Sequence, residues 1–106
     1  PQPKFFKDYK NLPNTEAGDW GGVHINSGIL NHTFYLFCIK AQTERGDERV
    51  NYSWNAPGAI WFATYRKINP DTDFQEFAIA TISTAKRIHP QLVNQLKAAW
   101  KETGVL

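Results

Sequence analysis

Between residues 74 and 88, apolar side chains recur every three or four residues, which is the spacing of one face of an α-helix. The stripe comprises Phe74, Phe77, Ala78, Thr81, Ile82, Ala85 and Ile88. Thr72 and Gln75 have the spacing of a capping box, in which Thr72 is the N-cap. We therefore expect a helix that begins after Thr72 and packs its apolar face into a protein core.

The segment from residue 26 to residue 43 is also expected to be helical. Its apolar side chains cover most of the helical circumference, which is typical of a buried helix. Asn26 or Ser27 could cap its N-terminus by accepting a hydrogen bond from a backbone N–H. A strand over residues 34–39 is the alternative, because short apolar runs fit both structures. Residues 44–56 are predicted to form a polar loop.

Two more helices are predicted after that loop. Pro57 presets a helical φ in a first turn, with Asn55 as a cap, and the helix continues through residues 59–68. His89 and Pro90 end the amphipathic stripe and open a last helix. Gly104 has the position of a C-terminal glycine. The side chains expected to face inward from the last helix are Leu92, Leu96, Ala99 and Trp100.

The chain of 106 residues is predicted to be one mainly α domain. Residues 1–25 form an irregular lead-in, with a short helix near residues 4–10 and a turn at Gly21-Gly22. Residues 26–106 form a compact bundle of about four helices. Because the sequence starts at Pro1 and contains no Met, we expect either a piece cut from a longer precursor or a single domain taken from a longer protein.

Composition argues against several classes of partner. The formal charge is +2, from 12 basic and 10 acidic residues, which is too balanced to indicate binding to nucleic acid or to an anionic membrane. No apolar run approaches the about 20 residues of a membrane span. The single cysteine, Cys38, cannot form a disulfide within the chain, and its apolar neighbours predict a buried core residue.

A carboxylate and an imidazole lie close together in sequence. Asp19 precedes His24, with Gly21 and Gly22 between them. The glycines allow a tight reversal, so Asp19 could accept a hydrogen bond from one ring nitrogen of His24 and leave the other N–H directed outward. Beside a helix N-terminus, this arrangement could bind a developing oxyanion. A purely structural Asp–His pair is the alternative.

The same stretch carries a family resemblance. Residues 21–29, Gly-Gly-Val-His-Ile-Asn-Ser-Gly-Ile, resemble the D-N-G-G-V-H-x-N-S-G-I segment of thermolysin-like neutral metallopeptidases. Matches in order at residues 2–16, 31–36, 59–65, 73–78 and 99–105 extend the resemblance over nearly the whole chain. The bacterial protealysin-type branch is the most similar one. The resemblance implies the C-terminal, α-helical half of a secreted, two-domain zinc metalloendopeptidase.

The resemblance also implies roles for individual residues. His24 falls on the histidine that donates a hydrogen bond to the tetrahedral oxyanion, and Asp19 on the aspartate that orients it. Asn26 and Ser27 fall on positions that we expect to be structural, setting the turn and the helix start. The implied partners are the N-terminal zinc-binding domain of the same parent and a peptide or protein substrate. Substrate-binding residues are not indicated.

The zinc site itself is not expected in this chain. The family holds zinc with two histidines of an H-E-x-x-H helix and a downstream glutamate, and no H-E-x-x-H occurs here. His32 and His89 are expected to be structural or exposed. The chain alone is therefore predicted to be catalytically inert and to bind no catalytic zinc. For calcium, the resemblance leaves open a parent that binds it and one that does not.

The sequence departs from the family pattern at two places. Trp20 stands where the family has asparagine, and Gly-Gly after the first long helix is replaced by residues 41–45, Ala-Gln-Thr-Glu-Arg. Two functional alternatives follow. One is a non-catalytic, protease-derived helical module that acts as an inhibitor or adaptor, whose gene would encode no upstream H-E-x-x-H. The other is a helical nucleic-acid binder, against which the balanced charge argues.

Overall fold

The computed structural model describes residues 2–45 and 54–106, apart from the side chains of Trp20, His24 and residues 43–45. The described residues contain four α-helices: α1 (Asp19–Arg45), α2 (Asn55–Tyr65), α3 (Phe74–Ile88) and α4 (Val93–Thr103). Two single turns of 3-10 helix, η1 (Phe6–Asp8) and η2 (Pro90–Leu92), accompany them. These residues form no strand. The predicted mainly α fold is confirmed, and the alternative strand over residues 34–39 is wrong.

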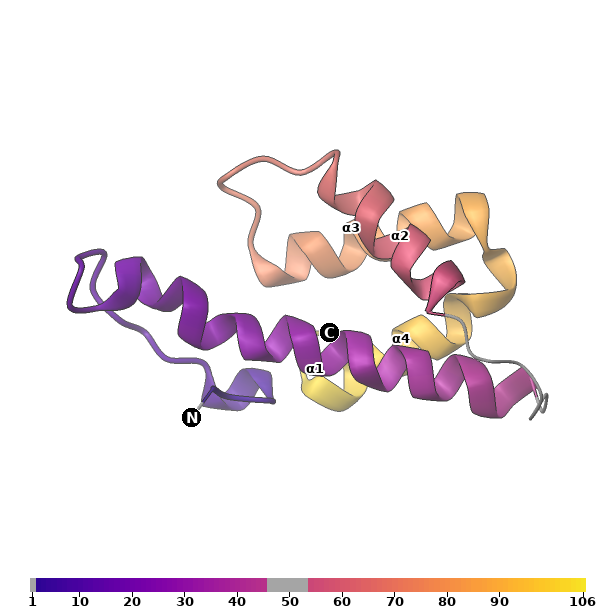
Figure 1. Cartoon of the computed structure of the whole chain (residues 1–106), viewed down its shortest axis with the longest axis horizontal. Helices are drawn as coiled ribbons and strands as arrows, with labels where there is room; N and C mark the ends of the chain where they lie inside the picture. The colour runs from indigo at the N-terminus through magenta and orange to yellow at the C-terminus, as the bar shows by residue number, and fades with distance from the viewer. Residues whose placement is uncertain (1, 46–53) are drawn as a thin grey trace.

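Helix α1 is the longest helix of the described residues. Its 27 residues extend over about 40 Å, close to the longest dimension of the molecule, 46 Å (Figure 1). Helix α4 packs along α1, and α2 packs against α3. The lead-in lies along the N-terminal part of α1 (Figure 1), and its η1 turn reaches the end of α4, where a Cβ at Gly104 would lie 3.7 Å from the Phe6 Cβ. The start of α1 is therefore held by the lead-in and the remainder by the bundle.

An aromatic cluster joins the helices in the core. Trp61 of α2 and Trp100 of α4 stack with ring centroids 5.4 Å apart and an interplanar angle of 9°. Phe77 of α3 meets both rings edge-on, at 5.6 Å from Trp61 and 6.1 Å from Trp100. Offset stacking and edge-to-face contacts are the favoured geometries of aromatic pairs. Trp100 is fully buried, as predicted, with Leu92, Leu96 and Ala99.

Buried threonines add polar contacts between helices. The Thr33 and Thr103 hydroxyl oxygens are 2.9 Å apart and join α1 to α4, and those of Thr64 and Thr84 are 2.9 Å apart and join α2 to α3. Each of these side chains also lies within hydrogen-bonding distance of a carbonyl oxygen in its own helix. The hydroxyl groups therefore have partners although they are shielded from water.

Helix ends differ in detail from the prediction. The capping box of α3 is formed by Asp73 and Glu76 rather than by Thr72 and Gln75: the Asp73 carboxylate accepts from Glu76 N at 2.7 Å, and Asp73 N donates to Glu76 Oε1 at 2.9 Å. Thr72 instead accepts from Asn69 N through its hydroxyl oxygen, at 3.2 Å. The Asp73 carboxylate, one residue further along, accepts from Glu76 N instead, so the cap shifts by one position.

At the other ends, α2 begins at Asn55 with Trp54 as its N-cap and ends at Tyr65, so the predicted cap at Asn55 and the extension to residue 68 are wrong. Pro57 lies in the first turn, as predicted. Gly104 ends α4 with a φ of 84°, which confirms the C-terminal glycine. Most of the predicted polar loop lies outside the described residues.

Candidate functional site

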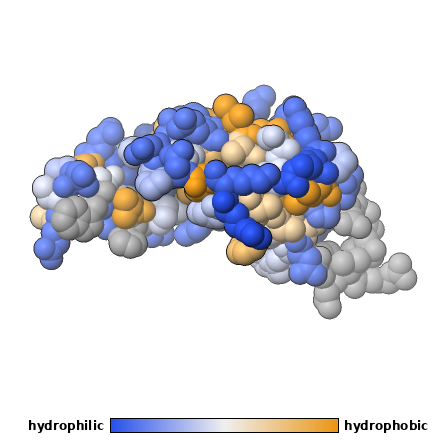
Figure 2. Space-filling model, turned by 90° about the horizontal axis from the view of Figure 1, so that it is seen from above, coloured by the Kyte–Doolittle hydropathy of each residue, from blue (hydrophilic) through white to orange (hydrophobic). Residues whose placement is uncertain are grey.

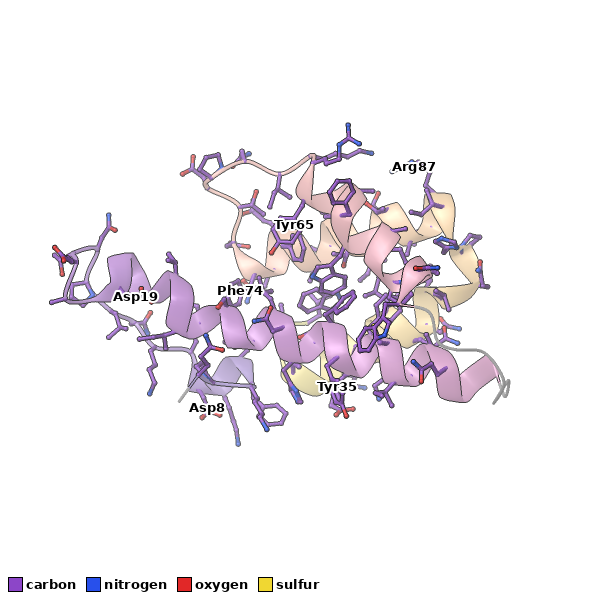
Figure 3. All side chains as sticks on the ribbon, in the orientation of Figure 1. Asp8, Asp19, Tyr35, Tyr65, Phe74 and Arg87 are labelled. Carbon is purple, nitrogen blue, oxygen red and sulfur yellow. The ribbon has the colours of Figure 1, made fainter. Side chains whose placement is uncertain are left out.

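The segment around Asp19 is a closed loop that turns onto the start of α1. Gly21 N donates to the Pro13 carbonyl oxygen at 2.9 Å, and Gly22 N donates to Gly18 O at 3.0 Å. A Cβ at Gly18 would collide with the Pro13 carbonyl oxygen. The loop therefore closes through main-chain contacts that leave no room for a larger residue at position 18, and it places Asp19 at the helix start (Figure 3).

Asp19 begins α1 in an unusual conformation. Its φ is 56°, and φ is 81° at Gly21 and 80° at Gly22. The Asp19 Oδ2 atom accepts a hydrogen bond from Ile25 N at 2.9 Å. The carboxylate thus pairs with a backbone donor at the N-terminus of the regular helix, where the helix dipole stabilises negative charge. Because the reversal at Asp19–Gly22 already belongs to α1, the predicted helix start and N-cap at Asn26 or Ser27 are wrong.

Asn26 lies inside α1 and holds the lead-in. Its side chain is 2% exposed. The Oδ1 atom accepts from Lys10 N at 2.8 Å, and the Nδ2 atom donates to Lys10 O at 2.9 Å. One amide therefore satisfies both polar groups of one lead-in residue. We predicted a structural role for Asn26, but not a contact with the lead-in.

Two glycines let the lead-in approach α1 closely. A Cβ at Gly22 would lie 2.5 Å from Asn26 Nδ2 and 3.3 Å from Lys10 O. A Cβ at Gly28 would lie 2.7 Å from the Pro3 carbonyl oxygen. Any side chain at either position would push the lead-in away from the helix. These motif glycines therefore serve the packing of the lead-in, a role that sequence reasoning missed because the contacts span distant residues.

His24 lies in the first turns of α1, one residue before Ile25. Its side chain is outside the described part of the structure, so its pairing with Asp19 stays a prediction. The neighbouring Val23 is 54% exposed, so its own side chain faces solvent. The structure thus places Asp19 and the His24 backbone on one turn, with the Asp19 carboxylate bonded to the residue after His24.

The other two histidines have structural surroundings. The His32 ring meets Phe5 edge-on at 5.6 Å and stacks with Tyr35 at 6.2 Å. His89 ends α3, and its Nδ1 atom is 3.5 Å from Gln91 Nε2. Within the described residues, no group of three or more His, Cys, Asp or Glu side chains could hold a metal ion. The donors described here do not fit a zinc site.

Cys38 is confirmed as a buried core residue, 1% exposed. Burial raises the pKa of its thiol to about 12. Large hydrophobic side chains are exposed on α1, α2 and α3: Val23, Tyr35, Ile39, Phe62, Tyr65 and Ile79 are more than two-fifths exposed. Figure 2 shows hydrophobic residues in several separate areas between hydrophilic ones on one face. In the described ranges, no helix is long and apolar enough to cross a membrane.

Comparison with known protein families decides the assignment. The thermolysin metallopeptidase alpha-helical domain matches residues 1–105. The chain belongs to the thermolysin metallopeptidase family. This domain family is α-helical, in agreement with the four helices described above.

Curated relatives support the family assignment over nearly the whole chain. Bacillolysin of Bacillus amyloliquefaciens is 36% identical over 105 residues, 98% of this chain and 18% of the relative. Protease PrtS of a Photorhabdus strain is 35% identical over 108 residues, 99% of this chain and 26% of the relative. An extracellular metalloprotease of Pectobacterium carotovorum is 34% identical, over 99% of this chain and 28% of the relative.

The thermolysin-family chain thus spans about a fifth to a quarter of the length of these relatives. No solved structure matches it. The match supports the resemblance carried by the Gly-Gly-Val-His-Ile-Asn-Ser-Gly stretch. In the structure, this stretch is the segment where the lead-in, the Asp19 loop and α1 meet.

Proposed function

We propose that this chain is the C-terminal domain of a secreted zinc metalloendopeptidase and that His24 stabilises the oxyanion formed during peptide-bond hydrolysis. When water attacks the scissile carbonyl, the carbonyl oxygen becomes negative. A ring N–H of His24 would donate a hydrogen bond to that oxygen, and the bond would be stronger in the transition state than in the bound substrate. Asp19 would fix the orientation of the His24 ring.

The observation that carries this proposal is the geometry of the turn at the start of α1. Asp19 is locked there by its own φ of 56° and by the 2.9 Å bond from Ile25 N to its carboxylate. His24 precedes Ile25, so the Asp19 carboxylate is bonded to the residue next to His24. A rigid support is what an oxyanion donor needs, because a preorganised donor does not have to reorganise during the reaction.

The remaining machinery is proposed to lie in the other part of the parent protein. Zinc would polarise the carbonyl and activate the attacking water, and the described residues of this chain do not supply its ligands. The partner of this chain is therefore the zinc-binding domain of the same protein, and the ligand shared by both is a peptide or protein substrate. Secretion is supported by the relative named as extracellular.

The test uses the full-length parent protein and a peptide substrate. His24→Ala is expected to lower kcat by about 10²–10³, as loss of one oxyanion donor does, with little change in KM. Asp19→Asn retains an acceptor for Ile25 N and is expected to give a smaller loss of kcat, because only the charge and the ring orientation change. Kinetics on the purified variants measure both effects.

His89→Ala is the matched control, because His89 ends α3 away from the Asp19 turn. It is expected to keep kcat within about twofold, as a surface substitution does. A loss of kcat below about tenfold in a folded His24→Ala protein would contradict the assignment of His24 as the oxyanion donor. Activity that survives a zinc chelator such as 1,10-phenanthroline would instead contradict the metallopeptidase function as a whole.

A further inference from the structure

We infer that Asn26 is a positioning residue for the Asp19–His24 turn, acting through the lead-in and not by contact with substrate. This inference rests on the proposed function of His24. The Asn26 amide is almost fully buried, and its two polar atoms hold the N–H and the C=O of Lys10 at 2.8 and 2.9 Å. Because the Lys10 N–H donates to the amide and the Lys10 C=O accepts from it, this pair of bonds fixes both the position and the orientation of the backbone at Lys10.

This clamp and the Asp19 carboxylate hold opposite ends of the same loop. The loop enters at Lys10, which Asn26 holds, and leaves at Asp19, which bonds Ile25 N. Asn26 directly follows Ile25, so both attachments are made on one turn of α1. A hydrogen bond from Gly21 N to the Pro13 carbonyl oxygen ties the middle of this loop to the start of α1. Loss of the entry attachment would release the loop at one end and let Asp19 shift relative to His24.

A second contact connects Asn26 to the backbone before His24. The space that a Cβ would take at Gly22 is bounded by Asn26 Nδ2, at 2.5 Å, and by Lys10 O, at 3.3 Å. The amide therefore packs directly on a glycine with a φ of 80° that lies two residues before His24. Without the Asn26 side chain, this left-handed turn loses its packing and can relax.

The clamp lies outside the main core, so its loss should act on the site more than on the fold. A buried hydrogen bond joins α1 to α4 further along, between Thr33 and Thr103. A misplacement of about 1 Å at a catalytic group can cost about 10²-fold in rate. Asn26→Ala in the full-length protein is therefore expected to lower kcat by about 10- to 100-fold, with KM changed by less than about threefold.

A double-mutant cycle with His24→Ala separates positioning from a structural role. If Asn26 acts through the Asp19–His24 turn, Asn26→Ala should lower kcat by less than about twofold further once the His24 ring is gone. Should Asn26→Ala prevent folding, Asn26→Asp takes its place in the cycle. That variant is nearly isosteric and still accepts from Lys10 N, but it replaces the donor to Lys10 O with a buried carboxylate oxygen that repels the carbonyl, so it opens the clamp at that bond.

Thr33→Val is the matched control, because Thr33 is a buried polar residue of the same helix, 0% exposed. It should change kcat by the same small factor with and without His24. If Asn26→Ala also lowers kcat by equal factors in both backgrounds, the positioning inference is overturned while the role of His24 stands. If His24→Ala alone costs less than about tenfold, the proposed function fails and the inference fails with it.

Discussion

At Asp19, the backbone and the side chain make two separate demands on one residue. A φ of 56° costs most residues roughly 1–2 kcal/mol, and Asp and Asn tolerate it best. The carboxylate then caps Ile25 N, which is worth about 1 kcal/mol. Only Asp and Asn meet both demands well, and only Asp adds the negative charge that the proposed pairing with His24 uses.

Cys38 allows a prediction about pH. Its folded pKa of about 12 is raised above the reference value of 9.0 by burial. The folded state therefore holds the thiol proton more tightly, and its contribution to stability is complete below pH 9 and decreases as pH rises towards 12. We expect the free energy of unfolding to fall over this range more steeply in the wild type than in Cys38→Ala.

Urea unfolding of both proteins at pH 7 and at several values between pH 9 and 10.5 measures this difference. Other groups that titrate in the range, such as Tyr and Lys, contribute equally to both proteins and cancel in the comparison. A constant difference between the two proteins at every pH would contradict a raised pKa of the Cys38 thiol.

At the scale of elements, the periodic helices were predictable and their ends were not. The stripe from Phe74 to Ile88 gave α3 because its repeat alone specifies a helix and a buried face. The start of α1 was misplaced because a Gly-Gly pair usually breaks a helix. Here Gly21 and Gly22 form part of its first turns, stabilised by bonds to Pro13 and Gly18 that no local pattern reveals.

Two glycines in helical context are expected to respond in opposite directions to alanine. Gly104 has a φ of 84° at the end of α4, so Gly104→Ala should destabilise the protein by about 1 kcal/mol. Gly58 lies in α2, and a Cβ there would meet nothing within 4 Å. Gly58→Ala should therefore stabilise it by about 0.5–1 kcal/mol. Thermal unfolding of both variants measures the shifts, and changes of the same sign would refute the conformational argument.

At the scale of the whole molecule, helix periodicity predicts which side chains are buried, and polar contacts between residues distant in sequence join the helices. Trp100 of α4 donates from its Nε1 atom to the Thr81 hydroxyl of α3 at 2.9 Å, and Thr81 donates in turn to Ala78 O at 2.6 Å. Sequence predicted that Trp100 and Thr81 face the core, but not that they meet. The Asn26–Lys10 contact of the candidate site was unpredictable for the same reason, since pairs distant in sequence leave no local signal.

The Trp100–Thr81 pair gives a prediction for the core. Trp100→Phe removes volume and the N–H donor together and should cost about 2–4 kcal/mol. Thr81→Val leaves the buried indole N–H without a partner and should cost about 1–3 kcal/mol. The double variant should be less destabilised than the sum, because both polar partners are then gone. Chemical denaturation of the three variants tests this, and strict additivity would contradict the coupling.

The clamp at Asn26 has a consequence for how this segment can vary among proteins that share it. Because the amide recognises the peptide group at position 10 and not the exposed Lys10 side chain, almost any amino acid could stand there without disturbing the geometry. Proline alone is barred, since it has no N–H to give. The partner of Asn26 is therefore the backbone at position 10, and a comparison of side chains at that position would not reveal the contact.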